Sequence, residues 1–265
     1  MPLQVVTIGF GAMARSLAAS LMKHGEEVHI GGALLPAEMD ATSPEEIVRF
    51  TDVDQLIAAR PHLVVECASH SAVRETLPKI LEAGIDVILV SIGALSDSST
   101  EQRLRAAERR GGSRLTLVSG AIGGLDMLRA ANLGGLNFVI YSGTKPPQAW
   151  IGTHAEALLD LPVLTKRTMF FDGSAREAAA LYPKNANVTA AVAIAGVGFD
   201  KTRVRLFADP DATENTHELE ACGAFGTLNV KLMNNPLPDN PKTSWLAALS
   251  IEEAVLNHFR TKAKM

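Results

Sequence analysis

Two glycines close to the start of the chain limit its possible folds more than any other residues. Gly9, Gly11 and Ala14 stand in the order G-x-G-x-x-A within TIGFGAMARSL, residues 7–17, directly after an apolar run. At a junction of strand and helix, the first glycine permits a tight turn and the second lets the backbone approach an anion. The small alanine lets the helix pack near the strand. Glycines also serve ordinary turns, so the motif gains its value from its context.

The context is a series of β-branched runs that alternate with helical patterns from Leu3 to Val118. The patterns predict strands at 3–9, 27–32, 62–68, 86–91 and 114–119, helices at 13–24, 71–83 and 99–110, and helix starts near Ser43, Pro44 and Glu46 and near Asp52 and Gln55. Strands this apolar are usually covered on both faces, as in a parallel sheet with helical crossovers. We therefore expect an α/β fold with a Rossmann-type, doubly wound parallel sheet, in which Gly9, Gly11, Ala12 and Met13 contact a dinucleotide pyrophosphate.

One feature of NAD sites is missing from the expected place. An acidic residue about 20 residues beyond the glycines usually binds the adenosine ribose hydroxyls. That region reads HIGGALL, with His29, Gly31 and Gly32 but no Asp, Glu or Arg. Glu26, Glu27 or Glu38 can serve instead, so the sequence leaves the choice between NAD and NADP open.

The second half of the chain has a different pattern. A small-residue loop, SGAIGGLDMLRAA, follows Val118, and a candidate role for it is contact with nicotinamide or substrate; the alternative is a plain linker. Longer strands follow in LNFVIYSGTK, LTKRTMFFDGS, TRVRLFADP and NTHELEACGAFGTLNVKLMNN, with one helix expected at Ala175–Ala195. Their polar alternation predicts an α+β domain with a mostly antiparallel, open-faced sheet. The expected domains are 1–120 for dinucleotide binding and 121–241 for substrate binding and dimerisation, with the terminal helix 242–265 packing back on the first.

Composition excludes several classes of function. The net charge is −4 and Lys and Arg are scattered, so a nucleic-acid partner is not expected. The absence of a long apolar run or a signal-peptide pattern predicts a cytoplasmic protein with no membrane partner. Cys67 and Cys222 match no paired spacing and are expected to be reduced thiols.

Three side chains are candidates for chemistry or binding. His217 stands among Glu214, Glu218 and Glu220, and a histidine titrates near neutral pH; carboxylate neighbours would raise its pKa. Asn187 and Lys184 lie in YPKNANV, where each also has an ordinary local role as a helix cap or a solvated cation. The remaining histidines, at 24, 29, 62, 70, 154 and 258, show no ligand spacing, and no metal is expected.

An ordered set of motifs resembles the L-aspartate dehydrogenase family, whose second domain is similar to that of dihydrodipicolinate reductase. The set is GFGAMA, VVECASHSAVRE, VSIGAL, SGAIGGLD, YPKNANVTAAVA and THELEACGAFG, spread over nearly the full length. The resemblance implies that His217 is the active-site histidine and that Ala121 and Asn187 contact the nicotinamide cofactor, NAD or NADP. It also implies a homodimer and a supply of iminoaspartate to pyridine nucleotide biosynthesis.

The reaction implied is hydride transfer between the nicotinamide and Cα of L-aspartate, giving oxaloacetate and ammonia after hydrolysis of the imine. His217 would assist proton transfer, and Lys184 is the candidate for binding a substrate carboxylate. Two alternatives stay open. One is another reductase of this architecture, of the homoserine or dihydrodipicolinate type, and the other is a non-catalytic NAD(P)-binding sensor.

Overall fold

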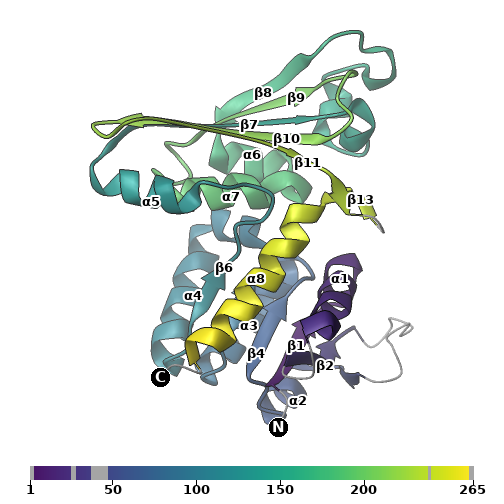
Figure 1. Cartoon of the computed structure of the whole chain (residues 1–265), viewed down its shortest axis with the longest axis vertical. Helices are drawn as coiled ribbons and strands as arrows, with labels where there is room; N and C mark the ends of the chain where they lie inside the picture. Colours follow the sequence, from purple (N-terminus) through teal and green to yellow (C-terminus); the bar gives the residue numbers. More distant parts are fainter. Residues whose placement is uncertain (1–2, 25–27, 37–46, 238–239, 263–265) are drawn as a thin grey trace. The chain divides into compact units, whose positions relative to one another are not determined.

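A computed structural model describes residues 3–24, 28–36, 47–237 and 240–262. The chain forms two compact units (Figure 1). Unit 1 consists of Met1–Val118 and Ala248–Met265, and unit 2 consists of Ser119–Ala247.

Unit 1 is built on a six-stranded sheet in which every neighbouring pair of strands is parallel. Its strands are β1 (Leu3–Ile8), β2 (Val28–Leu34), β3 (Val48–Phe50), β4 (Leu63–Glu66), β5 (Val87–Leu89) and β6 (Leu115–Leu117). The order β3-β2-β1-β4-β5-β6 reverses direction between β1 and β4, which is the arrangement of a doubly wound dinucleotide-binding sheet. The predicted fold class is confirmed for this half of the chain.

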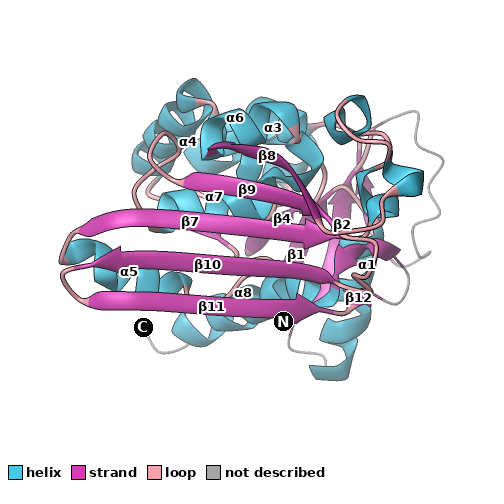
Figure 2. Ribbon diagram, turned by 90° about the horizontal axis from the view of Figure 1, so that it is seen from above, coloured by secondary structure: helices cyan, strands magenta, loops and turns pink. Residues whose placement is uncertain are grey.

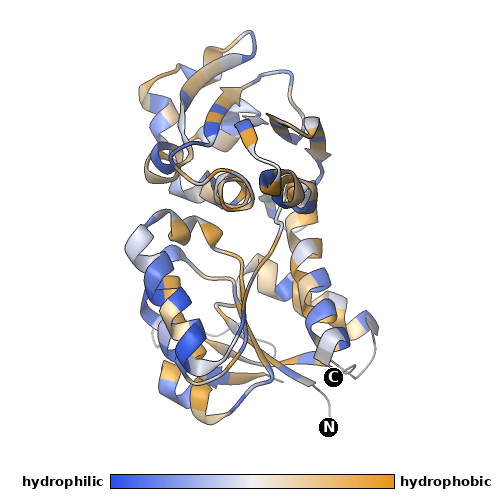
Figure 3. Cartoon of the chain, turned by 90° about the vertical axis from the view of Figure 1, so that its left-hand side faces the viewer, coloured by the Kyte–Doolittle hydropathy of each residue, from blue (hydrophilic) through white to orange (hydrophobic). Residues whose placement is uncertain are grey.

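Helices lie on both faces of this sheet, whose strands are coloured largely as hydrophobic in Figure 3. They are α1 (Ala12–Leu21), α2 (Val53–Ala58), α3 (His70–Glu82) and α4 (Ser98–Gly111), with short 3-10 turns η1 (Met22–His24) and η2 (Ile92–Ser96). Asp52, Ser69 and Asp97 cap α2, α3 and α4 by accepting hydrogen bonds from first-turn amides. The predicted cap at Asp52 is confirmed.

The region of β2 and β3 differs from the expectation. β2 runs to Leu34, so residues 29–34 of HIGGALL belong to the strand itself and only Leu35 follows it. A Cβ at Gly32 would lie 2.7 Å from the Phe50 ring, so the glycine allows β3 to pack closely. β3 was not predicted. The candidate acids Glu26, Glu27 and Glu38 and the candidate helix start at Ser43, Pro44 and Glu46 lie outside the described residues.

Unit 2 contains a five-stranded sheet in the order β11-β10-β7-β9-β8. Its strands are β7 (Leu136–Lys145), β8 (Thr168–Ser174), β9 (Arg203–Ala208), β10 (Asn215–Gly223) and β11 (Gly226–Asn234), and a separate small pair is β12 (Pro236–Leu237) with β13 (Asn240–Ser244). Only the β7 and β9 pair is parallel. Figure 2 looks directly onto β11, β10, β7 and β9, with no helix in front of these strands. The predicted mostly antiparallel, open-faced sheet is confirmed.

The other face of this sheet carries α5 (Leu125–Leu133), α6 (Ala175–Leu181) and α7 (Ala186–Ala195) (Figure 1). Short turns η3 (Pro147–Trp150), η4 (His154–Ala157) and η5 (Leu161–Val163) connect β7 to β8. The prediction of one helix at Ala175–Ala195 is wrong, because a 3-10 turn, η6 (Pro183–Asn185), separates α6 from α7. Pro183 has no amide hydrogen to donate and disfavours helical geometry in Tyr182, which has φ −128° and ψ 58°.

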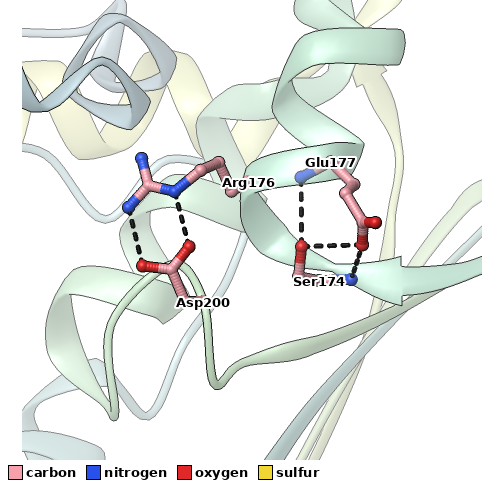
Figure 4. Close-up of polar contacts among 4 residues, drawn as sticks. All are labelled: Ser174, Arg176, Glu177 and Asp200. Carbon is pink, nitrogen blue, oxygen red and sulfur yellow. Dashed lines mark hydrogen bonds and ion pairs between the residues drawn. The ribbon is translucent and has the colours of Figure 1, made fainter.

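The start of α6 is fixed by its own side chains (Figure 4). Ser174 Oγ accepts a hydrogen bond from the Glu177 amide, and Glu177 Oε2 accepts one from the Ser174 amide. This capping box satisfies amides that the helix itself cannot pair. Arg176 also forms a two-point ion pair with Asp200, at 2.6 and 2.9 Å. The contacts fix the beginning of the segment that leads into YPKNANV.

The last helix, α8 (Trp245–Lys262), begins in unit 2 and contributes its residues from Ala248 onwards to unit 1. Ile251, Val255 and Phe259 are buried on one side of it. The cysteines, Cys67 and Cys222, are both free. In the described ranges, no helix combines the length and the apolar composition needed to cross a membrane.

Candidate active site

The turn after β1 has the geometry that its glycines predict. Gly9 has φ +80°, and a Cβ there would lie 3.0 Å from the Cβ of Ala68. Both the backbone conformation and this close contact therefore disfavour a side chain at position 9. Gly11 is the N-cap of α1 and has φ −79°, with no side-chain cap. A Cβ on Gly11 would meet nothing within 4 Å, so open space lies in front of this residue.

Glu66 holds the loops beside this turn. It is fully buried at the end of β4. Its Oε1 accepts hydrogen bonds from the amides of Ala68 and Ser69, at 2.8 and 3.0 Å, and from Ser91 Oγ at 3.0 Å. Its Oε2 accepts one from the Ser91 amide at 2.9 Å. Burial raises the pKa of Glu66, although these hydrogen bonds act in the opposite direction. One carboxyl group therefore joins the ends of β4 and β5 and holds Ala68 against Gly9.

A Glu66→Ala variant should lower the free energy of unfolding by about 3 kcal/mol, because each unsatisfied buried donor costs about 1–3 kcal/mol. Urea denaturation measures the change. Glu75→Ala, an exposed position on α3, is the matched control and should change the unfolding free energy by no more than about 0.5 kcal/mol. Equal losses in the two variants would contradict the structural role of Glu66.

These features fit the pyrophosphate of a dinucleotide. The strand order places the Gly9 turn beside the switch point of the sheet, where ligands bind in folds of this class. The open space at Gly11 and the uncapped start of α1 leave backbone amides available to an anion. Gly9 and Gly11 lie in this turn, and Ala12 and Met13 begin α1; their contact with a dinucleotide stays a prediction.

His217 lies in unit 2, buried on the face of β10 that points toward the helices. Its Nδ1 and the hydroxyl of Tyr141 are 2.7 Å apart, and the two rings are nearly parallel. His217 pairs with Gly143 of β7 in the sheet. A Cβ at Gly143 would lie 2.9 Å from the Tyr141 hydroxyl, so the glycine leaves the room that this contact needs.

The expectation that carboxylates raise the pKa of His217 is wrong. Burial, together with the positive charge of Lys145, lowers the pKa of His217 to about 3. Strand alternation explains the difference, because residues next to His217 in the chain point to the opposite face of the sheet. There Glu218 pairs with Arg167 and Lys231, at 3.7 and 3.4 Å. His217 is therefore neutral at physiological pH.

Lys145, the last residue of β7, is a basic group that sequence reasoning missed. Its Nζ donates a hydrogen bond to Asn185 Oδ1 and lies 5.3 Å from the centre of the Trp150 ring. Burial lowers the pKa of Lys145 to about 8. Lys145, Tyr141 and His217 thus form one cluster on the helix side of the sheet, defined here as the basic cluster.

The remaining predicted site residues are Ala121, Asn187 and Lys184. Ala121 is buried, and its carbonyl oxygen accepts a hydrogen bond from Asn234 Nδ2 at 3.0 Å. Asn187 is the second residue of α7. Lys184 lies in η6, and its side chain is outside the described part of the structure.

Strand alternation alone places Tyr141, Gly143 and Lys145 on one face of β7, so a signal for them was present in LNFVIYSGTK. Their meeting with His217 depends on the register of β7 and β10, which no local pattern specifies. Among the described residues no group of three or more His, Cys, Asp or Glu side chains could hold a metal ion.

Comparisons with known proteins agree with these features. Residues 126–258 match the family described as "Aspartate dehydrogenase, C-terminal", and residues 9–117 match "Homoserine dehydrogenase, NAD binding domain". The L-aspartate dehydrogenase of Cupriavidus necator is 46% identical over 259 residues, which cover 96% of this chain and 97% of the relative. That of Pseudomonas aeruginosa is 43% identical over 261 residues, with 97% of each chain covered.

Solved structures give the same assignment. The crystal structure of aspartate dehydrogenase from Thermotoga maritima is 28% identical, with a TM-score of 0.78 and 97% of each chain covered. A dihydrodipicolinate reductase from Paenisporosarcina, with a TM-score of 0.56 and 12% identity over 97% of this chain and 92% of its own, shares the fold alone. Since the C-terminal family model spans half of the chain and the L-aspartate dehydrogenases match nearly its full length, this chain belongs to the aspartate dehydrogenase family.

Proposed function

We propose that this protein is an NAD(P)-dependent L-aspartate dehydrogenase. In the oxidative direction L-aspartate, NAD(P)⁺ and water give oxaloacetate, ammonia, NAD(P)H and a proton. The nicotinamide, when bound, accepts the hydride that leaves Cα of the substrate, or returns it in the reverse reaction. The observation that carries the proposal is a buried, neutral histidine held by Tyr141 in a chain of this family.

The cofactor contacts proposed for this chain fall into two groups. Gly9, Gly11, Ala12 and Met13 bind the pyrophosphate through their backbone in unit 1. Ala121 and Asn187 in unit 2 are the proposed nicotinamide contacts. The support for the first group is the uncapped start of α1 and the open space before Gly11.

His217 is the proposed proton acceptor and donor. The substrate amine must lose its proton before Cα can release a hydride, and a neutral imidazole can take that proton at Nε2. The Tyr141 hydroxyl donates to Nδ1 in one tautomer of neutral His217 and accepts from Nδ1–H in the other. It also accepts from the imidazolium, so Tyr141 supports both directions of proton transfer.

The substrate has two carboxylates, and each needs a cationic or amide partner. Lys184 is one proposed partner. The product imine is chemically suited to supply pyridine nucleotide biosynthesis, which we propose as the physiological use of the reaction.

A spectrophotometric assay tests the proposed function. Consumption of NADH or NADPH should depend on both oxaloacetate and ammonia, and comparing the two cofactors gives the preference. Turnover of homoserine or dihydrodipicolinate substrates in place of oxaloacetate would favour a different reductase. Saturable cofactor binding without consumption of any of these substrates would favour a sensor.

We also propose that the protein is a homodimer that pairs through the open face of the unit 2 sheet. Strand register places Phe138, Met169 and Met233 on that face, and each side chain is at least 42% exposed. A sheet face that no helix covers and that carries exposed apolar side chains is typical of an interface between subunits. A depression of about 330 Å³ next to Arg167 and Lys231 adds polar groups to the same face.

Sedimentation analysis tests the dimer. The wild-type protein should sediment at twice the monomer mass of 28.2 kDa. A double variant with Phe138→Lys and Met233→Lys should shift to the monomer, because it introduces charges into an apolar contact. Leu133→Lys is the control, since Leu133 is 92% exposed at the end of α5 and off the sheet. A monomeric wild-type protein would overturn the proposed homodimer.

A further inference from the structure

The basic cluster contains more positive charge than its described surroundings balance. Lys145 lies two residues along β7 from Gly143, which is directly opposite His217, so both basic side chains project from the same face of the sheet. Asn185, which accepts from Lys145 Nζ, is two residues before Asn187 in the YPKNANV motif. The lysine therefore lies among residues that the proposed function already uses.

No carboxylate neutralises this lysine within the described ranges, where no Asp or Glu oxygen lies within 4.0 Å of Nζ. Lys79 and Lys231, which are 58% and 60% exposed, do pair with carboxylates, Asp54 and Glu218. The partners of Lys145 are an uncharged amide oxygen and the face of the Trp150 ring. These contacts fix the position of the ammonium group and leave its charge uncompensated.

An uncompensated cation in a desolvated place costs free energy, and an arriving anion would offset that cost. A carboxylate beside Lys145 would also oppose its repulsion of a proton on His217. Binding an anionic substrate would in this way make His217 a better proton acceptor at the moment when it is needed. The same carboxylate would have no such effect if it bound elsewhere on the surface.

We infer that Lys145 binds a carboxylate of the substrate and thereby selects dicarboxylic acids. This inference rests on the proposed function, because it assigns a ligand to the substrate of that same site. Asn185 and Trp150 act as positioning residues that hold the lysine ammonium in its place within the basic cluster.

Kinetic measurements on Lys145→Met test this assignment. Its KM for oxaloacetate should rise about 10- to 100-fold, the usual effect of losing a hydrogen bond to a charged group, while kcat stays within about threefold. Lys145→Arg should restore much of the affinity, because it keeps the positive charge. Lys201→Met, at an exposed position in the turn before β9, removes the same charge and should leave both constants unchanged.

Pyruvate and oxaloacetate identify the carboxylate that is bound. Pyruvate lacks the second carboxylate, so a rise in KM confined to oxaloacetate assigns Lys145 to the side-chain carboxylate. An equal rise for both substrates assigns it to the carboxylate next to the reacting carbon. The first result supports the inference, and the second overturns its claim that Lys145 selects dicarboxylic acids.

Calorimetry with succinate provides a readout that needs no turnover. Wild-type protein saturated with NADH should bind succinate more tightly than butyrate, and Lys145→Met should lose at least about tenfold in succinate affinity. Thermal melting shows whether the variant is folded. If it is not, Lys145→Gln, which still donates a hydrogen bond to Asn185, takes its place.

Succinate affinity and oxaloacetate KM within about threefold of wild type in a folded variant would overturn the inference and leave the proposed function intact. A fall in kcat with no rise in KM would overturn it as well. If the wild-type protein binds succinate through Lys145 but does not reduce oxaloacetate, the carboxylate site stands and the proposed reaction fails. If it neither binds succinate nor reduces oxaloacetate, both fail.

Discussion

A His217→Ala variant should keep its fold and its affinity for the dinucleotide and lose roughly 10²–10⁴ in kcat. That range is the usual contribution of one positioned acid or base. The alanine removes the imidazole of the basic cluster, and the Tyr141 hydroxyl is a poor replacement for it, since burial raises the pKa of Tyr141. Steady-state kinetics in both directions, with the dissociation constant of NADH measured by fluorescence, provide the comparison.

Tyr141→Phe is the matched variant for this prediction. It keeps the buried ring and removes only the hydroxyl that lies 2.7 Å from His217 Nδ1. We expect a smaller loss of kcat than for His217→Ala, because the imidazole remains and only its orientation and tautomer are less well defined. Near-normal turnover of His217→Ala would remove the histidine from the mechanism, whatever the tyrosine variant does.

The second large effect is expected at the start of α1. Gly11→Val should weaken dinucleotide binding about 5- to 150-fold, which corresponds to the 1–3 kcal/mol that crowding a packed contact usually costs. The free protein should tolerate the change, because Gly11 has φ −79° and a Cβ there meets nothing within 4 Å. A loss of binding with an unchanged melting temperature therefore reports on the ligand and not on the fold.

Gly134→Val is the control for this substitution. Gly134 also has a negative φ, −87°, at the end of α5, and the nearest atom to its Cβ would be 3.5 Å away. The dinucleotide affinity of the Gly134→Val variant should match that of the wild-type protein. If Gly11→Val binds the dinucleotide as tightly as the control does, the pyrophosphate does not lie against this turn.

Structural features that depend only on residues close together in the sequence were predictable. The G-x-G-x-x-A order, the apolar runs of β1 and β4 and the alternation in β7 are local patterns, and each produced an element of the expected type. The break at Pro183 was also a local signal, and the interpretation of one continuous helix overlooked it. The parallel pairing of β7 with β9 joins segments about 60 residues apart, and no local pattern specifies it.

The candidate site was less predictable than the fold for the same reason. His217 gained its importance from family resemblance, and its low pKa depends on burial that only the packed sheet produces. Lys145 looks like an ordinary lysine at the end of YSGTK, since lysines are rarely buried. Glu66 ends an apolar strand, and its four hydrogen bonds come from loops that meet only when β4 and β5 pair.

The division of unit 1 into two sequence segments has a consequence for its synthesis. Ile251, Val255 and Phe259, which are buried on α8, leave the ribosome after the whole of unit 2. At 5–20 residues per second, translation of the intervening part takes roughly 6–26 s. During that time the parallel sheet has its strands but not its last covering helix. The nascent chain thus exposes an apolar surface until α8 has been synthesised and covers it.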